Sequence, residues 1–396
     1  MEKLFVIHIV SLLFVCIPCN CDELHTDSVI AVEILDVAEL KKQAEKGNAD
    51  AQIELGCLYY NGKCGVKKNY SEAIKLFQKT ACNGNVYGKY WLGVCYDEGN
   101  GVDENFTKAN TLYKEAYAIF SKMADSCDAQ AQYYLGLCYY FGRGTEENEN
   151  LAFIAYKKAA EQGYAPAQSF VGSCFFSGSG TKQSYSEAVK WYRLAAEQGD
   201  MEAICILGMC YYGGIGITQS YTEAVRWYRP AAEQGDTIAQ YMLGLCYEEG
   251  KGVNQSYSEA VKWYRLAAEQ GNAAAQCGLG FCYFYGNGVS QSYTEGIKWY
   301  RKAAEQGYVQ AQSYLGHCFY YGDGVTRSYK EAVKWFRLAA EQGDAIAQCR
   351  LGLCYGKGEG VQQSKSEAIK WFKKAAKQGN EEAISTLEIL GINDYE

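Results

Sequence analysis

The chain has 396 residues, of which 48% are hydrophobic and 21% are charged, and its formal net charge is −8. This negative charge, with no run of basic residues, argues against non-specific binding of nucleic acid. Only three histidines occur, which excludes the usual acid–base and zinc constellations, so no catalytic residue, metal ligand or cofactor is expected.

The N-terminus is predicted to be an export signal. An apolar run over residues 4–17 follows a short polar start and is too short for a comfortable membrane span. Small residues precede Asp22, so residues 1–21 are assigned as a cleaved signal peptide and residues 22–35 as a linker. The protein is therefore expected in the secretory pathway, as a secreted, periplasmic or endoplasmic-reticulum luminal protein. An uncleaved anchor is the alternative, and only that alternative would hold the protein at a membrane.

The rest of the chain repeats one unit. The glycine of a recurring Leu-Gly pair serves as a ruler, and its positions are Gly56, Gly93, Gly136, Gly172, Gly208, Gly244, Gly280, Gly316 and Gly352. From Gly136 onward the spacing is 36 residues. The step before it has seven extra residues near 117–123, which are close to two helical turns and can lengthen a helix without rotating its buried face.

Each copy predicts two helices. Counted from the ruler glycine, Ala at −5, Leu at −1, Cys at +2 and Tyr or Phe at +3 form one buried face of the first helix. The second helix begins with Ser-x-x-Glu, a capping box, and ends before the glycine of Ala-Ala-Glu-Gln-Gly. The Gly-x-Gly-Val segment between the helices indicates a tight turn rather than a phosphate loop, because it returns in nearly every copy.

A helix pair of this kind cannot bury its own apolar face, so its neighbours must stack on it. Residues 36–47 and 381–391 match half-repeats that would cap the two ends. The chain is therefore expected to form one continuous all-α solenoid over residues 36–391, followed by a short tail at 392–396.

These motifs resemble the SEL-one-like repeat, a longer relative of the tetratricopeptide repeat, with nine copies over nearly the whole predicted mature chain. The resemblance implies a right-handed superhelical solenoid of stacked helix-turn-helix repeats of about 36 residues, used as a non-enzymatic scaffold or adaptor for other proteins. Similar members serve in endoplasmic-reticulum quality control and as secreted bacterial host-interaction proteins. A cysteine-rich branch, some of whose members were described as weak β-lactamases, supplies the alternative of a hydrolase. The disulfide staple of that branch is missing, because Ala340 and Gln348 occupy its positions.

Eight cysteines occupy the +2 position of the first helix. Equivalent positions in stacked helices are too far apart for a ladder of disulfides. At the two ends of the array Leu58 and Leu390 take this position, which favours an apolar packing role. If disulfides form, Cys57 and Cys64 are the first candidates, and a metal or redox role for the thiols stays open.

A partner is expected to bind along the first helices. Positions −3, +1, +4 and +5 lie opposite the constant stripe and vary between copies, and the first helices of such solenoids usually line the concave side. Tyrosine-rich variable positions suit a protein-binding groove, although aromatic side chains could instead fill gaps between repeats. The candidate partner-binding residues are Tyr140, Phe176, Tyr212, Glu248, Phe284, His317 and Tyr320. The recurring tryptophans of the second helices are predicted to pack between repeats.

Overall fold

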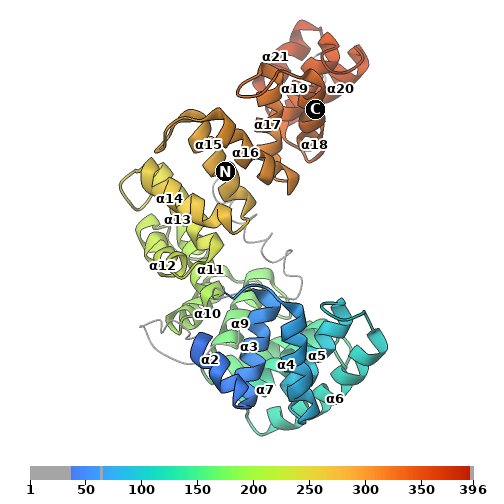
Figure 1. Ribbon diagram of the computed structural model, residues 1–396, viewed down its shortest axis with the longest axis vertical. Helices are drawn as coiled ribbons and strands as arrows, with labels where there is room; N and C mark the ends of the chain where they lie inside the picture. The colour runs from blue at the N-terminus through green and yellow to red at the C-terminus, as the bar shows by residue number, and fades with distance from the viewer. Residues whose placement is uncertain (1–36, 63–65, 393–396) are drawn as a thin grey trace. The chain divides into compact units, whose positions relative to one another are not determined.

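The computed structural model describes residues 37–62 and 66–392, and these residues form twenty helices and no strand (Figure 1). The predicted all-α, helix-turn-helix architecture is confirmed. The predicted signal peptide, the whole predicted linker and Cys64 lie outside the described residues. Two compact units, residues 1–235 (unit 1) and 236–396 (unit 2), are each described by themselves. The prediction of one continuous solenoid stays a prediction.

Unit 1 begins with one short helix, after which helices alternate between the first and the second helix of a repeat. Its helices are α2 (Val37–Glu45), α3 (Ala49–Asn61), α4 (Tyr70–Cys82), α5 (Val86–Glu98), α6 (Phe106–Asp125), α7 (Ala129–Phe141), α8 (Glu149–Glu161), α9 (Ala165–Ser177), α10 (Tyr185–Glu197), α11 (Met201–Gly213) and α12 (Tyr221–Glu233).

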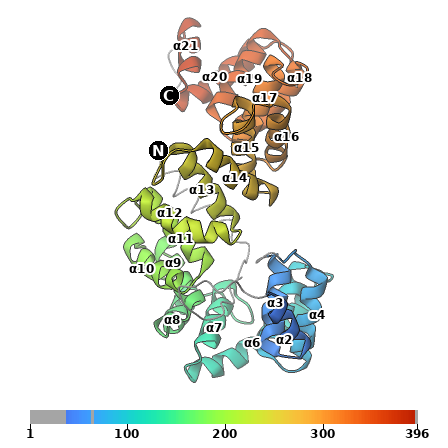
Figure 2. The ribbon, with the colours of Figure 1, turned by 60° about the vertical axis from the view of Figure 1, so that its left-hand side comes forward.

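Unit 2 continues the same alternation, so that in both units every odd-numbered helix from α3 to α19 is a first helix (Figure 2). Its helices are α13 (Thr237–Glu249), α14 (Tyr257–Glu269), α15 (Ala273–Tyr285), α16 (Tyr293–Glu305), α17 (Val309–Tyr321), α18 (Tyr329–Glu341), α19 (Ala345–Lys357), α20 (Lys365–Lys377) and α21 (Glu381–Ile389).

The helix starts follow from capping. In α14 the hydroxyl of Ser256 accepts a hydrogen bond from the backbone N–H of Glu259 at 3.3 Å, and the other five Ser-x-x-Glu sequences form the same cap. The first helices have their own caps, which the sequence motifs did not reveal. Asp236 accepts from the N–H of Ala239 at 2.7 Å, and Asn272 accepts from that of Ala275 at 2.9 Å.

The ruler glycine marks the crossing of the two helices of a repeat. A Cβ atom at Gly244 would lie 2.6 Å from the ring of Tyr264 on the second helix, closer than real contacts allow. Glycine therefore lets the two helices approach, and the large ring fills the space between them. The same arrangement recurs at Gly172 with Tyr192 and at Gly316 with Phe336.

The core is shared between successive repeats. In unit 2 one buried cluster combines Tyr264 of α14, Leu279 and Cys282 of α15, and Trp299 of α16. The thiol of Cys282 thus packs as an apolar group, and the tryptophan of one repeat packs into the core of the repeat before it. Both interpretations, of the +2 cysteines and of the tryptophans, are confirmed for this cluster.

The extra residues of unit 1 lengthen one helix as predicted. Helix α6 has 20 residues where most repeat helices have 13, and Tyr113, Ala116 and Phe120 keep one face buried along it. Its end differs from those of the other second helices. Cys127 adopts a left-handed backbone with φ of 62°, in the place where the other copies have glycine.

Candidate functional site

The +4 aromatic residues pack inside their own repeat. The ring of Phe176 lies 4.9 Å from that of Tyr185, the first residue of the following helix, and Tyr212 lies 5.1 Å from Tyr221 in the same way. Both Phe176 and Tyr212 are buried, with 4% and 3% of their surface exposed. These two predicted binding residues therefore offer almost no side-chain area to a partner.

The other candidate aromatics at +4 are only partly buried. Phe284 and Tyr320 repeat the intra-repeat ring contact, at 4.8 Å to Tyr293 and 5.2 Å to Tyr329. The hydroxyl of Tyr320 also donates to Glu359 at 2.5 Å, and burial together with this carboxylate raises the pKa of the tyrosine. Tyr140, the remaining aromatic, lies half-buried in unit 1 with its ring 4.9 Å from that of Phe141.

The acidic +4 residue of unit 2, Glu248, makes a different contact. Its carboxylate accepts a hydrogen bond from the hydroxyl of Tyr264, and burial raises the pKa of this carboxyl group. Unit 1 has the same pairing, since the hydroxyl of Tyr113 donates to the +4 residue Asp97 at 3.1 Å. The tyrosine that packs against the ruler glycine can therefore be paired with an acidic residue at +4 as well as with an aromatic one.

His317 lies among aromatic rings. Its imidazole stacks on Tyr321 at 6.0 Å and meets the edge of Phe336 at 5.2 Å. Burial lowers the pKa of His317 to about 4, with a further contribution from Arg350, so the imidazole is neutral at physiological pH. It can contribute an apolar face and a hydrogen bond, but not a positive charge, to a binding surface.

Position −3 was predicted to face outward, and this prediction is wrong. Tyr90, Tyr133 and Cys277 hold this position and are all buried. Positions +5 and −2 carry the most exposed rings of the first helices in unit 2. Tyr285 and Tyr321, both at +5, are 55% and 54% exposed, so the variation at +5 was the informative signal.

Five aromatic side chains lie on α15 and α17 in two groups of ring contacts. Phe281 lies 4.6 Å from Tyr285 on its own helix and 6.3 Å from Tyr314 on the next first helix. The stacked pair of His317 and Tyr321 forms the second group, on α17. These five residues are called the α15/α17 aromatic surface below.

A buried arginine is the clearest polar feature of unit 1 that the motifs missed. The guanidinium of Arg143 lies 5.5, 5.3 and 4.7 Å from the ring centres of Tyr90, Tyr113 and Phe141. It donates to the hydroxyl of Tyr90 at 2.7 Å and lies 3.7 Å from a carboxylate oxygen of Glu98. Aromatic faces and a carboxylate together stabilise this desolvated charge.

The cysteines at +2 are buried thiols without disulfides in the described part of the chain. Burial raises the pKa of Cys246 and of Cys282 to about 12, so neither forms a reactive thiolate at neutral pH. Within residues 37–62 and 66–392, no group of three or more His, Cys, Asp or Glu side chains could hold a metal ion. The suggested bridge from Cys57 to Cys64 involves a residue outside the described ones.

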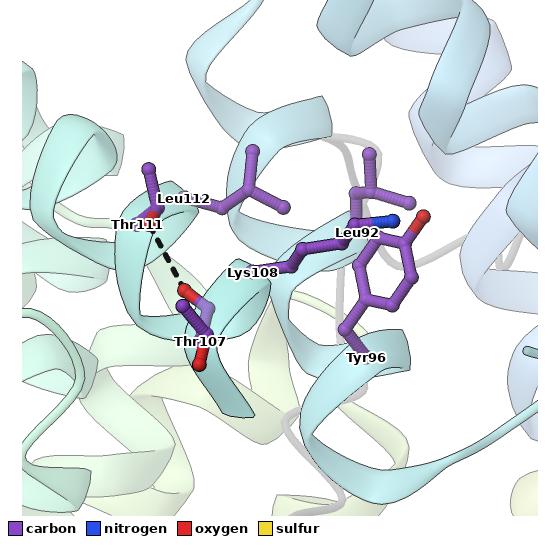
Figure 3. Close-up of a pocket in the computed structure, with 6 residues that line it drawn as sticks. All are labelled: Leu92, Tyr96, Thr107, Lys108, Thr111 and Leu112. Carbon is purple, nitrogen blue, oxygen red and sulfur yellow. Dashed lines mark hydrogen bonds between the residues drawn. The ribbon is translucent and has the colours of Figure 1, made fainter. Parts of the chain in front are cut away.

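A hollow of about 340 Å³ lies between α5 and α6 of unit 1 (Figure 3). Its lining residues are Leu92, Tyr96, Thr107, Lys108, Thr111 and Leu112. The hydroxyl of Thr111 is occupied by a hydrogen bond to the backbone carbonyl of Thr107 at 2.9 Å, and Lys108 lies over the ring of Tyr96. The lining of this hollow contains no carboxylate, thiol or imidazole.

The fold and surfaces define a repeat protein built of helical hairpins. Nine segments match the Sel1 repeat, so the chain belongs to the Sel1 repeat family, as its motifs indicated. The segments are residues 49–85, 86–118, 129–164, 165–200, 202–236, 237–272, 273–308, 309–344 and 345–380.

Two solved structures are similar over most of the chain. A Sel1 repeat protein from Oxalobacter formigenes is 30% identical, with a TM-score of 0.60, over 80% of this chain and 90% of that one. The c5321 protein, a protective antigen present in uropathogenic Escherichia coli strains, is 32% identical, with a TM-score of 0.52, over 91% and 84%.

Curated relatives match over shorter stretches. The ERAD-associated E3 ubiquitin-protein ligase component HRD3B of Arabidopsis thaliana is 38% identical over 79 residues, which are 20% of this chain and 12% of that protein. The DAP3-binding cell death enhancer 1 of Rattus norvegicus is 39% identical over 77 residues, 19% of this chain and 14% of that protein. The matches thus span only a small part of these relatives.

Proposed function

We propose that this chain is a non-enzymatic scaffold that binds another protein through the α15/α17 aromatic surface. Membership of the Sel1 repeat family supports an interaction role, because stacked repeats present an extended surface. The β-lactamase-like alternative is not proposed, since no arrangement of the described residues favours it.

The exposure of Tyr285 and Tyr321 carries this proposal. The same +5 position holds Ser177, Gly213 and Lys357 in other copies, so the repeat does not need an aromatic ring there. Exposed tyrosines that folding does not require are typical of protein-binding surfaces, where they give large contact area at low entropic cost.

We further propose that the signal-like segment at residues 1–21 directs export into the secretory pathway. The protein is then secreted, periplasmic or in the lumen of the endoplasmic reticulum. No helix within the described residues is both long and apolar enough to cross a bilayer. Expression of the full chain with a C-terminal tag, followed by N-terminal sequencing of the product, tests this part. A mature protein that begins at Asp22 is expected, and a product that keeps residues 1–21 contradicts cleavage.

The binding proposal is tested with the double variant Tyr285→Ser/Tyr321→Ser. Serine occurs naturally at +5 in Ser177, so the fold should keep its helicity and thermal midpoint. Affinity capture from the native milieu, with identification by mass spectrometry, should recover a partner with the wild type but not with the double variant. Phe106→Ser is the matched control, because Phe106 is 64% exposed in unit 1 and lies outside the proposed surface. Undiminished capture by the double variant contradicts the site.

A further inference from the structure

The arginine site of unit 1 has a counterpart in unit 2 that lacks its arginine. Counted from the ruler glycines, the residues that contact Arg143 lie at −3, +5 and +20 of one repeat and at +5 of the next, and the acid at +4 accepts the hydrogen bond of the tyrosine at +20. In unit 2 these positions hold Tyr241, Glu248, Glu249, Tyr264 and Tyr285. Aromatic and acidic character is therefore kept at every one of them.

The geometry of the counterpart also agrees. The rings of Tyr241 and Tyr264 lie 5.9 Å apart, and those of Tyr90 and Tyr113 in unit 1 lie 5.8 Å apart. In both units the tyrosine at +20 donates its hydroxyl to the acid at +4. The fold thus builds twice a pair of tyrosine rings at nearly the same separation and a hydrogen bond from one of them to a carboxylate, although the angle between the two rings is 52° in unit 1 and 29° in unit 2.

Asn287 occupies the place of the arginine itself. Its backbone N–H donates to the carbonyl of Cys282 at 2.9 Å, as that of Arg143 donates to Cys138 at 2.9 Å. Both residues lie between two glycines with positive φ, at 78° and 72° in unit 2 and at 65° and 80° in unit 1. The turn is the same, but the asparagine side chain carries no charge.

The charge of this region is therefore not balanced in the same way. Glu249 has an ion pair with Lys251 at 3.0 Å, from its own turn. Within the described residues Glu248 has no lysine or arginine within ion-pair distance, and its hydrogen-bond donor is the neutral hydroxyl of Tyr264. A half-buried carboxylate without a cation is complementary to a cation from outside.

We propose that Glu248, Tyr264 and Tyr285 of unit 2 bind the guanidinium of an arginine side chain that a partner protein supplies. This inference rests on the proposed function and adds the chemistry of the partner. Arginine suits the site better than lysine, because a planar guanidinium can stack on a ring while it pairs with a carboxylate. Arg143 lies over three rings in this way, and its ion-pair partner is Glu98 at +5, whereas in unit 2 the acid without a cation is Glu248 at +4. Tyr285 supplies the ring that corresponds to Phe141, and Glu248 supplies the acceptor.

The test titrates the full chain with N-acetyl-L-arginine amide and with its uncharged analogue N-acetyl-L-citrulline amide, followed by NMR. The arginine probe should bind at least about tenfold more tightly than the citrulline probe. Asn287→Arg should abolish binding, because an arginine of the chain's own then fills the site, and it should also raise the thermal midpoint. Asn287→Gln is the matched control and should bind the probe as the wild type does. Glu248→Gln should weaken binding about tenfold.

Equal binding of the two probes overturns the assignment, as does full binding of the arginine probe to a folded Asn287→Arg variant. Glu248→Gln keeps the test decisive even if Asn287→Arg does not fold. The outcome is separable from the proposed function. If the double variant Tyr285→Ser/Tyr321→Ser loses a partner that Asn287→Arg still binds, that result supports the scaffold proposal and contradicts the proposal that the partner supplies an arginine.

Discussion

The carboxylate of Glu248 lies half-buried on α13, at a position that is tyrosine or phenylalanine in six of the other copies. The hydroxyl of Tyr264 orients it, yet no positive charge from the described chain offsets its desolvation. A residue that lowers the stability of the fold is a candidate for a binding role, because a residue kept for function can reduce the free energy of unfolding.

Glu248→Gln should therefore stabilise the protein at neutral pH. Burial raises the pKa of Glu248 above 4.5, so as pH rises past that value the unfolded chain releases this proton before the folded chain does. Unfolding becomes easier through this window, until the folded carboxyl ionises as well. Glutamine still accepts the hydrogen bond but cannot ionise, so its advantage should appear above pH 4.5 and vanish well below it.

Urea unfolding of both proteins across this pH range measures the difference. Glu269→Gln, which removes an exposed carboxylate from the next helix, is the control and should leave the pH profile unchanged. A wild type that is more stable than Glu248→Gln at neutral pH would contradict the argument.

Cys127 is a second residue that is expected to destabilise the fold, because it has a side chain but adopts a left-handed backbone conformation. It is the one described non-glycine residue with positive φ, and Gly163 and Gly199 hold the same place after other second helices. Cys127→Gly should raise the free energy of unfolding by about 1 kcal/mol, because the left-handed backbone strains a residue with a Cβ atom.

The reciprocal change, Gly163→Cys, is the matched control in chemical denaturation. An added Cβ at Gly163 meets no atom within 4 Å, so its cost reports the backbone alone. It should lower the free energy of unfolding by a similar amount, about 1 kcal/mol. A neutral or harmful effect of Cys127→Gly shows that the thiol makes a compensating contact.

Between elements, buried glutamines at −4 of the first helices link three helices at a time. The amide of Gln276 on α15 donates to the carbonyl of Ala268 on α14 at 3.1 Å, and its oxygen accepts from Gln306 at the end of α16 at 2.8 Å. Gln312 and Gln348 make the same bonds in the next two repeats of unit 2. The recurring Ala-Gln of the motif is thus a polar tie between helices.

Gln276→Leu should lower the free energy of unfolding by about 1–3 kcal/mol, because it removes two hydrogen bonds, the one donated to the carbonyl of Ala268 and the one accepted from Gln306. Ile204, which replaces this glutamine in α11, gives the matched control. Ile204→Leu changes a side chain of the same size without a polar tie and should cost less than about 1.5 kcal/mol. Equal losses in urea titration would show that the glutamine contributes only its volume.

For whole units, the repeat period predicted the helix pairs, because the spacing of apolar residues along one chain fixes which face of a helix is buried. The repeat period could not predict which side chains outside the constant stripe are exposed to solvent. Phe176 is buried and Phe284 is half-buried at the same +4 position, because exposure there depends on how the next helix and the next repeat cover the ring. The arginine cluster was invisible for the same reason, since Tyr90 and Arg143 are 53 residues apart in sequence.

The stacking of repeats also predicts how a local change spreads through the molecule. Helix α21 covers the end of unit 2, where Leu387 and Ala383 are buried in one cluster with Phe372 of α20 and Cys349 of α19. Truncation after Asn380 removes α21 and exposes these apolar groups. In a linear array each repeat contacts only its neighbours, so the damage should stay local.

Hydrogen–deuterium exchange of the truncated chain should therefore show strong loss of protection in α19 and α20, weaker loss in α17, and none in α5 to α8 of unit 1. Losing the buried side chain of Leu387 alone removes about 2–3 kcal/mol of local stabilisation, enough to raise the open population of the last repeat by roughly 30- to 160-fold. The substitution Glu388→Ala, at an exposed position of the same helix, is the control and should leave protection unchanged. Equal loss of protection in both units would show instead that the chain unfolds as one cooperative body.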